Sequence, residues 1–303
     1  MKIRKELLEQ EKISYAMEHI ELPEGGVDCS EGCNPYGFPP ECAEALKNFD
    51  PARLGPYPHS DALYDAIREF WKEQIDVEHH NVLLTDGSIN ALYIINNIFD
   101  THNSVVLGVS PQFTDYYMHA EMIGIDYAPY QLKPQYNYKF DASEFMSMHY
   151  IADTFAYASM PTKSYNVSEL AREVGAVALK HPEFVEKSKA DFVDMKAQIR
   201  EALTPSTVRK LKKNADAEYE EVKIHGASSG HLHMAETLDT NSLLLLYHDN
   251  KDIKLYDEFL RRKVLVIDGY DFKGLDSNSA RIRLPRMEEF PVLLQAIKEI
   301  NKL

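Results

Sequence analysis

Residues 85–92 read TDGSINAL and place Gly87 and Ser88 between an apolar segment and a helix-like one. The start of a helix exposes free backbone N–H groups and the positive end of the helix dipole, which both favour an anion. Gly87 lets the backbone approach a ligand closely and Ser88 supplies a hydroxyl, so the segment is typical of a phosphate cradle. On the motif alone, an ordinary strand-to-helix turn, capped by Asp86 or Ser88, explains the same residues better.

An aromatic-rich segment, SPQFTDYY (110–117), directly follows the next apolar run of the chain. In open α/β sheets, ligands bind beyond the carboxyl ends of the strands. An aromatic side chain at that place could stack on a flat ring. The alternative is a cluster of Tyr and Phe side chains that fills the core.

Two arginines alternate with apolar residues in ARIRLP (280–285). On a strand, this alternation puts Arg281 and Arg283 on one side, with Ile282 and Leu284 on the other. The planar fork of an arginine suits a carboxylate. A polar strand face paired with nearby acidic side chains is the alternative.

Lys163 lies between a threonine and a serine in MPTKSYNVSEL (160–170). A catalytic amine needs a depressed pKa and a place beside its reaction partner. The residues that follow predict a helix start instead, with Ser168 as N-cap and Ala171 in the first turn. The pattern therefore favours a helix lead-in for Lys163 and keeps a catalytic amine as the alternative.

The elements that must position these residues alternate between strands and helices in the first half of the chain. Apolar patterns predict strands at 81–85, 104–109 and 126–132, with helices between them. This order indicates an α/β sheet with parallel strands. A helical stretch over 168–203, broken near Pro182, leads to a small C-terminal α+β layer. Further helices are predicted at 3–18, 39–49, 62–74, 253–263 and 287–301, and further strands at 241–248, 264–268 and 280–284.

The charge and hydropathy of the chain exclude several kinds of partner. Its net charge of −15 argues against nucleic acid and anionic membrane surfaces. The one dense basic run, VRKLKK (208–213), is followed at once by acidic residues and predicts a solvated helix face. No apolar stretch reaches the roughly 20 residues that span a bilayer, and the first 20 residues lack the apolar core of a signal peptide. We expect a cytoplasmic protein.

A metal site is not predicted. The three cysteines, Cys29, Cys33 and Cys42, are too few for a disulfide framework and lack a fourth ligand, so we expect reduced thiols. HLH (231–233) could offer two histidines from one strand face, but a surface strand explains it better.

Five segments, in this order, resemble the class I/II aminotransferases of the fold-type-I pyridoxal-phosphate enzymes. The histidinol-phosphate aminotransferase branch is the most similar. The segments are NPYG (34–37), GPYPHSDALYDAI (55–67), LLTDGSINAL (83–92), SPQFTDYYMHAEMIG (110–124) and ARIRLPRMEEFPVLLQAI (280–297).

The resemblance implies a binding role for each matching residue. Gly87 and Ser88 would hold the phosphate of pyridoxal 5′-phosphate, and Tyr116 would stack on its ring. Tyr57 would reach the phosphate in a neighbouring subunit, which implies a homodimer.

It also implies a substrate, namely a small amino acid or phosphorylated amine. Arg281 would bind its α-carboxylate. Asn34 and Gly37 would lie in an arm that closes over it.

The chain departs from the family in its middle. It contains no NPTG-like and no DEAY-like segment, and Lys163 with Arg172 and Gly175 only imitates the family's lysine motif. The resemblance thus implies a fold-type-I α/β protein with a reduced central sheet and a small C-terminal α+β domain. We divide it into an N-terminal helix and arm (1–50), a remnant of the large cofactor-binding α/β domain (51–150), and a long helix with the C-terminal domain (151–303).

Two functions follow. One is a pyridoxal-phosphate aminotransferase-like protein that moves an amino group between an amino acid or amino-phosphate and a 2-oxo acid, impaired by the missing segments. The other is a non-catalytic relative that binds a phosphorylated or amino-acid ligand or a partner chain.

Overall fold

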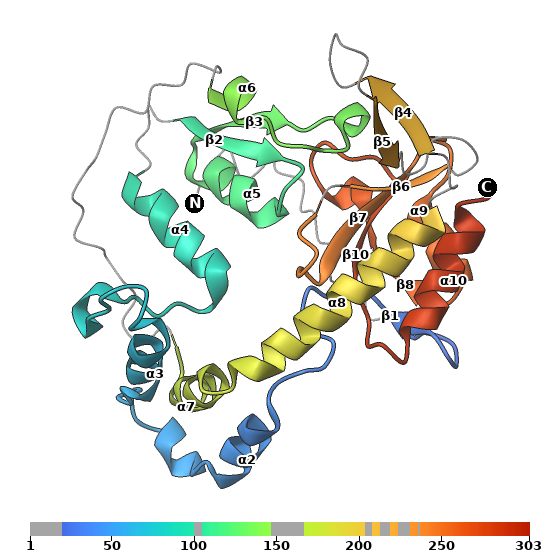
Figure 1. Cartoon of the computed structure of the whole chain (residues 1–303). Helices are drawn as coiled ribbons and strands as arrows, with labels where there is room; N and C mark the ends of the chain where they lie inside the picture. Colours follow the sequence, from blue (N-terminus) through green and yellow to red (C-terminus); the bar gives the residue numbers. More distant parts are fainter. Residues whose placement is uncertain are drawn as a thin grey trace, which may run out of the picture.

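The computed structural model describes residues 20–99, 105–146, 167–203, 208–212, 219–223, 231–235 and 237–303. The predicted helix at 3–18 and Lys163 lie outside these residues. Figure 1 shows the two main parts, a group of helices with a small parallel sheet and a C-terminal sheet covered by helices, joined by the long helix α8.

The N-terminal part is an arm followed by short helices. Its elements are β1 (Val27–Asp28), α2 (Pro40–Asn48), η1 (Pro51–Leu54), α3 (Ala62–Trp71) and η2 (His79–Asn81). The predicted helices at 39–49 and 62–74 are confirmed as α2 and α3. Pro40 at the first position of α2 has no N–H to leave unsatisfied, which suits a helix start.

A parallel strand–helix–strand unit follows. It contains α4 (Gly87–Phe99), β2 (Val105–Ser110), α5 (Thr114–Ile123), β3 (Asp126–Gln131), η3 (Pro134–Tyr136) and α6 (Ala142–Met146). β2 pairs in parallel with β3, so α5 is the crossover helix between them. Gly124 ends α5 in a left-handed conformation, with φ of +84°.

The predicted strand at 81–85 is wrong. Residues 82–85 are irregular and half-buried, and they lead directly into α4. An extended segment becomes a strand only when a neighbouring strand takes its backbone hydrogen bonds. Among the described residues, β2 and β3 pair only with each other, so no partner strand lies beside 82–85.

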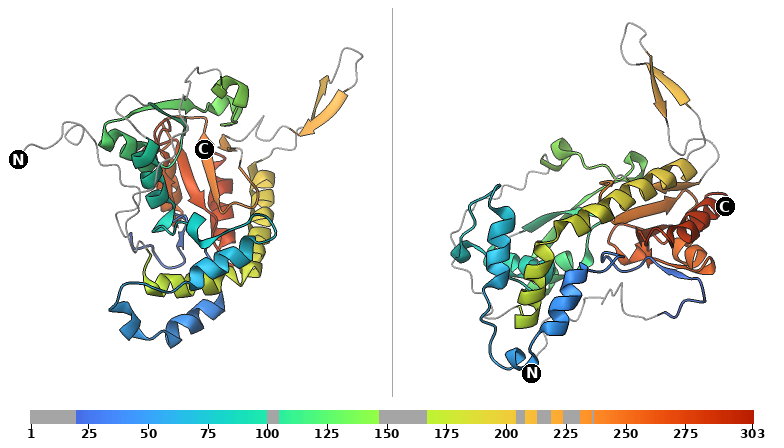
Figure 2. Two further views of the ribbon diagram at one scale, coloured as in Figure 1. Left: turned by 90° about the vertical axis from the view of Figure 1, so that its left-hand side faces the viewer. Right: turned by 60° about the horizontal axis from the view of Figure 1, so that its bottom comes forward.

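Two helices connect this unit to the C-terminal part, and the predicted break is confirmed. α7 (Glu169–Leu179) begins at Ser168, whose hydroxyl accepts the Ala171 N–H at 3.2 Å. α8 (Pro182–Leu203) restarts at the predicted proline. α7 packs against α2 and α3, while α8 runs across to α10 (Phe290–Ile300) (Figure 2).

The basic run VRKLKK does not form the predicted helix face. It forms β4 (Val208–Lys212), which pairs antiparallel with β5 (Tyr219–Lys223). The register sets Lys210 opposite Glu221. The acidic residues Glu220 and Glu221 thus lie in the strand that pairs with the basic run.

The C-terminal sheet has four antiparallel strands in the order β6–β7–β10–β9. They are β6 (Leu232–Met234), β7 (Leu243–His248), β9 (Ile267–Asp268) and β10 (Ser279–Arg283), with β8 (Val264–Leu265) paired to β1, and with α9 (Leu255–Arg261) and η4 (Gly269–Asp271). The predicted strand at 264–268 is thus two short strands in different sheets.

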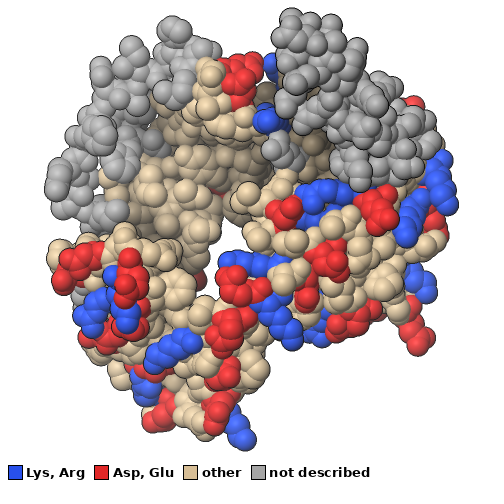
Figure 3. All heavy atoms as spheres, viewed as in Figure 1, with Lys and Arg blue, Asp and Glu red and all other residues tan. Residues whose placement is uncertain are grey.

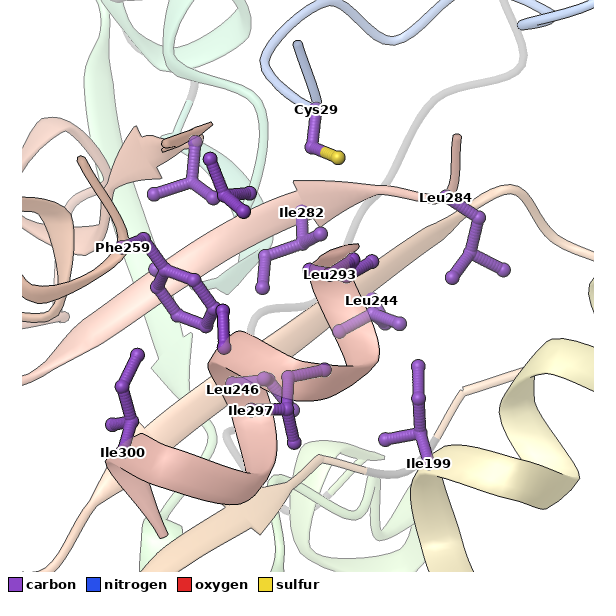
Figure 4. Packing of buried hydrophobic residues seen from close by; sticks show 14 of the residues in the cluster. Cys29, Ile199, Leu244, Leu246, Phe259, Ile282, Leu284, Leu293, Ile297 and Ile300 are labelled. Atoms are coloured by element: carbon purple, nitrogen blue, oxygen red, sulfur yellow. The ribbon is translucent and has the colours of Figure 1, made fainter. Parts of the chain in front are cut away.

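One face of this sheet forms the main core. Leu244 and Leu246 of β7 and Ala280 and Ile282 of β10 turn toward α8, α9 and α10 (Figure 4). Apart from Val27 and Cys29, the fully buried members of this core come from residues 192–300. The alternate residues of β7 and β10, including Arg281, lie on the opposite face of the sheet. The fold is α/β with a small parallel sheet and a C-terminal α+β layer, as predicted.

Candidate functional site

The N-terminus of α4 carries the predicted phosphate cradle. Gly87 is its first residue and has φ of +73°, and no atom lies within 4 Å of a Cβ built on it. The space beside the Gly87 Cα at the start of this 13-residue helix is therefore open, while the Gly87 N–H donates to the Thr85 carbonyl at 3.0 Å. Thr85 fixes the turn, because its hydroxyl donates to the Gly87 carbonyl at 3.0 Å. Both the cradle and a simple turn fit this geometry.

A buried polar contact joins α4 to α5. The Asn96 amide nitrogen lies 3.2 Å from His119 Nδ1, and both side chains are buried. The Tyr93 ring stacks on His119 with centroids 4.0 Å apart. Burial lowers the pKa of His119, which favours the neutral ring that this contact needs. The helix that begins at Gly87 is thereby held against the helix that carries Tyr116.

The aromatic cluster of α5 divides between two roles. Tyr117 is buried and fills the core of the unit, as the simpler interpretation expects. Tyr116 is half-buried and meets the edge of Tyr127 with ring centroids 6.3 Å apart. Burial raises the pKa of Tyr127 to about 12, and its hydroxyl accepts from the Gln112 amide at 2.5 Å. The position of Tyr116 is thus supported from one side by a second aromatic ring.

Arg281 and Arg283 lie on the predicted side of β10. The guanidinium of Arg281 donates to the Ser30 carbonyl, and that of Arg283 donates to the Asp28 carbonyl. Arg281 also lies 5.8 Å from the centre of the Phe272 ring. Both arginines therefore hold the arm that follows β1.

Gly32 lies close to the guanidinium of Arg281. A Cβ on Gly32 would be 3.6 Å from Nη1. A side chain at position 32 would narrow the space through which a ligand could reach the Arg281 guanidinium.

The arm with Asn34 and Gly37 docks on α8. The Asn34 amide donates to the Ser188 hydroxyl at 3.1 Å, and the Tyr36 hydroxyl donates to Asp191 at 2.6 Å. The Asn34 carbonyl accepts the Gly37 N–H at 3.0 Å, which closes a turn that Gly37 completes with φ of +81°. Burial, followed by the bond to Asp191, raises the pKa of Tyr36 to about 12.

Tyr57 extends from a loop that α7 fastens. Its side chain is 70% exposed. Glu169 accepts the His59 and Ser60 N–H groups at 3.0 Å each, and it also pairs with Arg53 at 2.5 Å. The loop that carries this exposed tyrosine is thus fixed to the start of α7.

Arg172, which imitates the arginine of the family's lysine motif, also helps to fix the loop of Tyr57. Its Nη1 donates to the Ser60 carbonyl at 3.1 Å and its Nε to the Val167 carbonyl at 3.2 Å. Its side chain is buried against Tyr64. This role is structural.

The long helix α8 carries a buried lysine, Lys196. Lys196 of α8 is fully buried, and its amine donates to the Leu238 carbonyl at 2.6 Å. Burial lowers its pKa to about 8.

In the part of the chain that the structure describes, no group of three or more His, Cys, Asp or Glu side chains is placed to hold a metal ion. His233 of the HLH segment lies 2.8 Å from Asp249. Cys29 and Cys42 are buried and Cys33 is exposed, all as free thiols. Among the described helices none is both long and apolar enough to cross a membrane.

The space-filling view shows an opening between the side of the molecule that carries α4 and the side that carries α8 (Figure 3). Charged side chains rim its α8 side. Sequence reasoning did not find the residues that support the site, Asn96, His119, Glu169 and Asp191. They act through contacts between distant segments, for which the one-dimensional pattern holds no signal.

Comparisons with known proteins show similarity in the first half of the chain. Residues 25–148 match the family model described as aminotransferase class I and II. The histidinol-phosphate aminotransferase of Lactiplantibacillus plantarum is 31% identical over 91 residues, which are 30% of this chain and 25% of that protein. The enzyme of the same name from Pseudomonas syringae is 30% identical over 105 residues, which are 34% of this chain and 29% of that protein. The chain thus spans about a quarter of the length of the curated relatives it matches.

Solved structures extend the likeness to the whole fold. The histidinol-phosphate aminotransferase of Clostridium acetobutylicum superposes with a TM-score of 0.63 at 14% identity, over 91% of this chain and 99% of that one. An aminotransferase from Staphylococcus aureus gives 0.61 at 16% identity, over 99% of each chain. The chain has the fold of the fold-type-I aminotransferases. The resemblance of its sequence to class I/II aminotransferases, and to the histidinol-phosphate branch, is confirmed.

Proposed function

We propose that this chain is a pyridoxal-phosphate-binding, aminotransferase-like protein that acts on a small amino acid or phosphorylated amine and a 2-oxo acid. The observation that carries the proposal is the open helix start at Gly87, joined by the Tyr93–His119 and Asn96–His119 contacts to the helix of Tyr116. An open anion site and a supported aromatic ring are the two features that a phosphate-bearing planar ligand requires.

Each residue of the site has a role in this proposal. The α4 amides and the Ser88 hydroxyl hold the phosphate, and Tyr116 stacks on the ring. Arg281 pairs with the substrate carboxylate beside Gly32. Bound pyridoxal phosphate supplies an electron sink, while the protein supplies binding, orientation and proton transfer. The residues present fit the phosphate and the ring; Lys163, the weak candidate for the amine, lies outside the described residues.

The remaining expectations complete the proposal. Tyr57 reaches the phosphate site of a second copy, so the protein is a homodimer. Asn34 and Gly37 belong to an arm that closes over the substrate. The protein acts in the cytoplasm, and nucleic acid and membranes are not its partners.

A titration with pyridoxal phosphate tests the proposal. We expect saturable binding, seen in the absorbance of the cofactor. Gly87→Ala should weaken binding about 10- to 100-fold, because a Cβ enters the space through which the phosphate reaches charge-assisted hydrogen bonds. Gly25→Ala is the matched control. Gly25 has φ of +74° and equally open surroundings, but lies in the turn before β1. It should cost the same stability and leave binding unchanged.

Absence of saturable binding by the unaltered chain would falsify the proposal, and so would equal losses of affinity in the two glycine variants. The half-reaction with amino acids separates the two functions that the sequence allows. Conversion of bound cofactor that Lys163→Met abolishes establishes an enzyme. Binding without conversion establishes the non-catalytic relative.

A further inference from the structure

A short segment between β9 and β10 joins the C-terminal sheet to the α5 unit. The Ser110 hydroxyl donates to the Lys273 carbonyl at 2.5 Å, and the Thr114 hydroxyl donates to the Asp271 carbonyl at 3.0 Å. Ser110 and Thr114 are buried, so these carbonyls satisfy hydroxyl groups that water does not reach. The bonds reach the end of β2 and the first turn of α5.

The side chain of Lys273 strengthens the same contact. Its amine lies 4.8 Å from the centre of the Tyr117 ring and 5.7 Å from that of Tyr127. Glu121 of α5 lies 3.4 Å away. An exposed ion pair alone would contribute little. A cation over two aromatic rings, one of them buried, adds an attraction that depends on the placement of both parts.

The residue between these anchors turns back toward the arginine. Phe272 has extended backbone angles, φ of −115° and ψ of 124°. It is buried with Ile267 and Leu275. The Arg281 guanidinium lies over its ring. Three consecutive residues therefore touch the Tyr116 helix on one side and Arg281 on the other.

We infer that Lys273 and Thr114 are positioning residues that set the separation between Tyr116 and Arg281. The inference rests on the proposed function, in which these two residues hold the ring and the carboxylate of one bound pair of ligands. Within one chain, the proposed contacts of the cofactor all lie in the α4–α5 unit. A loss of positioning therefore weakens the binding of the amino acid, while the binding of pyridoxal phosphate stays nearly the same.

The test uses Lys273→Met, which keeps the length of the stem and removes the charge. We expect about two- to fivefold weaker binding of an amino acid or phosphorylated amine to the cofactor-loaded protein, the scale of one cation–π contact. Affinity for pyridoxal phosphate should stay within about twofold. Lys273→Arg should restore amino-acid binding. Lys251→Met is the matched control, because Lys251 makes an exposed pair with Asp276 on the same part of the molecule.

A second measurement needs no ligand. Hydrogen exchange of the backbone amides in 271–275 and in the first turn of α5 should speed up in Lys273→Met and in Thr114→Val, but not in Lys251→Met. If the hydrogen-exchange rates stay unchanged in Lys273→Met and Thr114→Val, the contact between segment 271–275 and α5 is not stabilising. Parallel losses of cofactor and amino-acid affinity overturn the positioning role, because they indicate general damage. If the unaltered chain binds no pyridoxal phosphate, the proposed function and this role both fail, while the exchange data still report on the contact.

Discussion

The rings of Tyr93 and His119 stack with their centroids 4.0 Å apart, and this stacking joins the helix that begins at Gly87 to the helix that carries Tyr116. Asn96 adds a buried hydrogen bond to the same ring. The relative placement of the proposed phosphate cradle and the proposed aromatic face thus depends on one neutral histidine.

Acid should weaken this contact. Burial lowers the pKa of His119 below its unfolded value of about 6.5. The stabilisation is therefore complete above about pH 6.5 and is lost as the pH falls toward the folded pKa. Urea unfolding between pH 5 and 8 measures it. In His119→Phe, the free energy of unfolding should depend less on pH. Some dependence should remain, because the pKa of buried His248 is also lowered. An unchanged slope in His119→Phe would contradict the role.

Glu169→Gln should loosen the loop of Tyr57. The carboxylate accepts two backbone N–H groups and pairs with Arg53, whereas an amide offers one acceptor oxygen and no charge. We expect a loss of about 1–3 kcal/mol in the free energy of unfolding and faster proteolysis within 51–61. Glu186→Gln, in an exposed pair with Lys189, should change stability by less than about 0.5 kcal/mol. Equal losses of stability in Glu169→Gln and Glu186→Gln would argue against the role of Glu169 in holding the loop of Tyr57.

Lys196→Met should not destabilise the protein at neutral pH. A buried amine costs solvation that its two polar contacts only partly offset, and Met fills a similar volume. The pKa of Lys196 is lowered to about 8, so the unfolded chain binds more protons between pH 8 and about 10.4. The unaltered protein should gain stability over that range, and Lys196→Met should lose this gain. Lys196→Ala controls for volume and should cost about 2–4 kcal/mol through the cavity it leaves. If Lys196→Met loses as much stability as Lys196→Ala, the amine of Lys196 stabilises the fold.

Arg281→Lys should separate carboxylate binding from folding. Lysine keeps the charge but loses the planar fork, so we expect at least about tenfold weaker amino-acid binding with unchanged affinity for pyridoxal phosphate. Arg283→Lys is the companion variant on the same strand face. Arg283 is buried and holds the Asp28 carbonyl, so its replacement should lower stability without changing carboxylate affinity. Calorimetric titration and thermal unfolding of both variants give the comparison. Equal effects on carboxylate affinity would remove Arg281 from the site.

Local signals in the sequence predicted much of the fold. The N-cap Ser168 and the break at Pro182 placed α7 and α8, and alternation at 280–284 put Arg281 and Ile282 on opposite faces. The same reasoning failed at 81–85, because an apolar run indicates burial and not a partner strand. It failed at 208–212 because the charges of a segment do not distinguish a paired strand from a helix face.

The sequence also predicted only some residues of the candidate site. The sequence predicted Gly87, Tyr116 and Arg281, from a motif at a helix start and on a strand and from the family resemblance, and their roles stay predictions. Residues such as Glu169 and Lys273 matter through contacts with segments about a hundred or more positions away, such as Ser60 and Ser110. No periodicity or motif reports such pairs. The three-dimensional arrangement alone identifies them.

The main core draws all but two of its fully buried members from residues 192–300. During synthesis, the α4–α5 unit leaves the ribosome well before α10, which closes that core. The apolar face of the C-terminal sheet therefore stays partly uncovered until α10 has been made. Such partly uncovered states are prone to aggregation. Chaperone supply and the rate of translation should therefore limit the yield of folded protein more strongly than its final stability does.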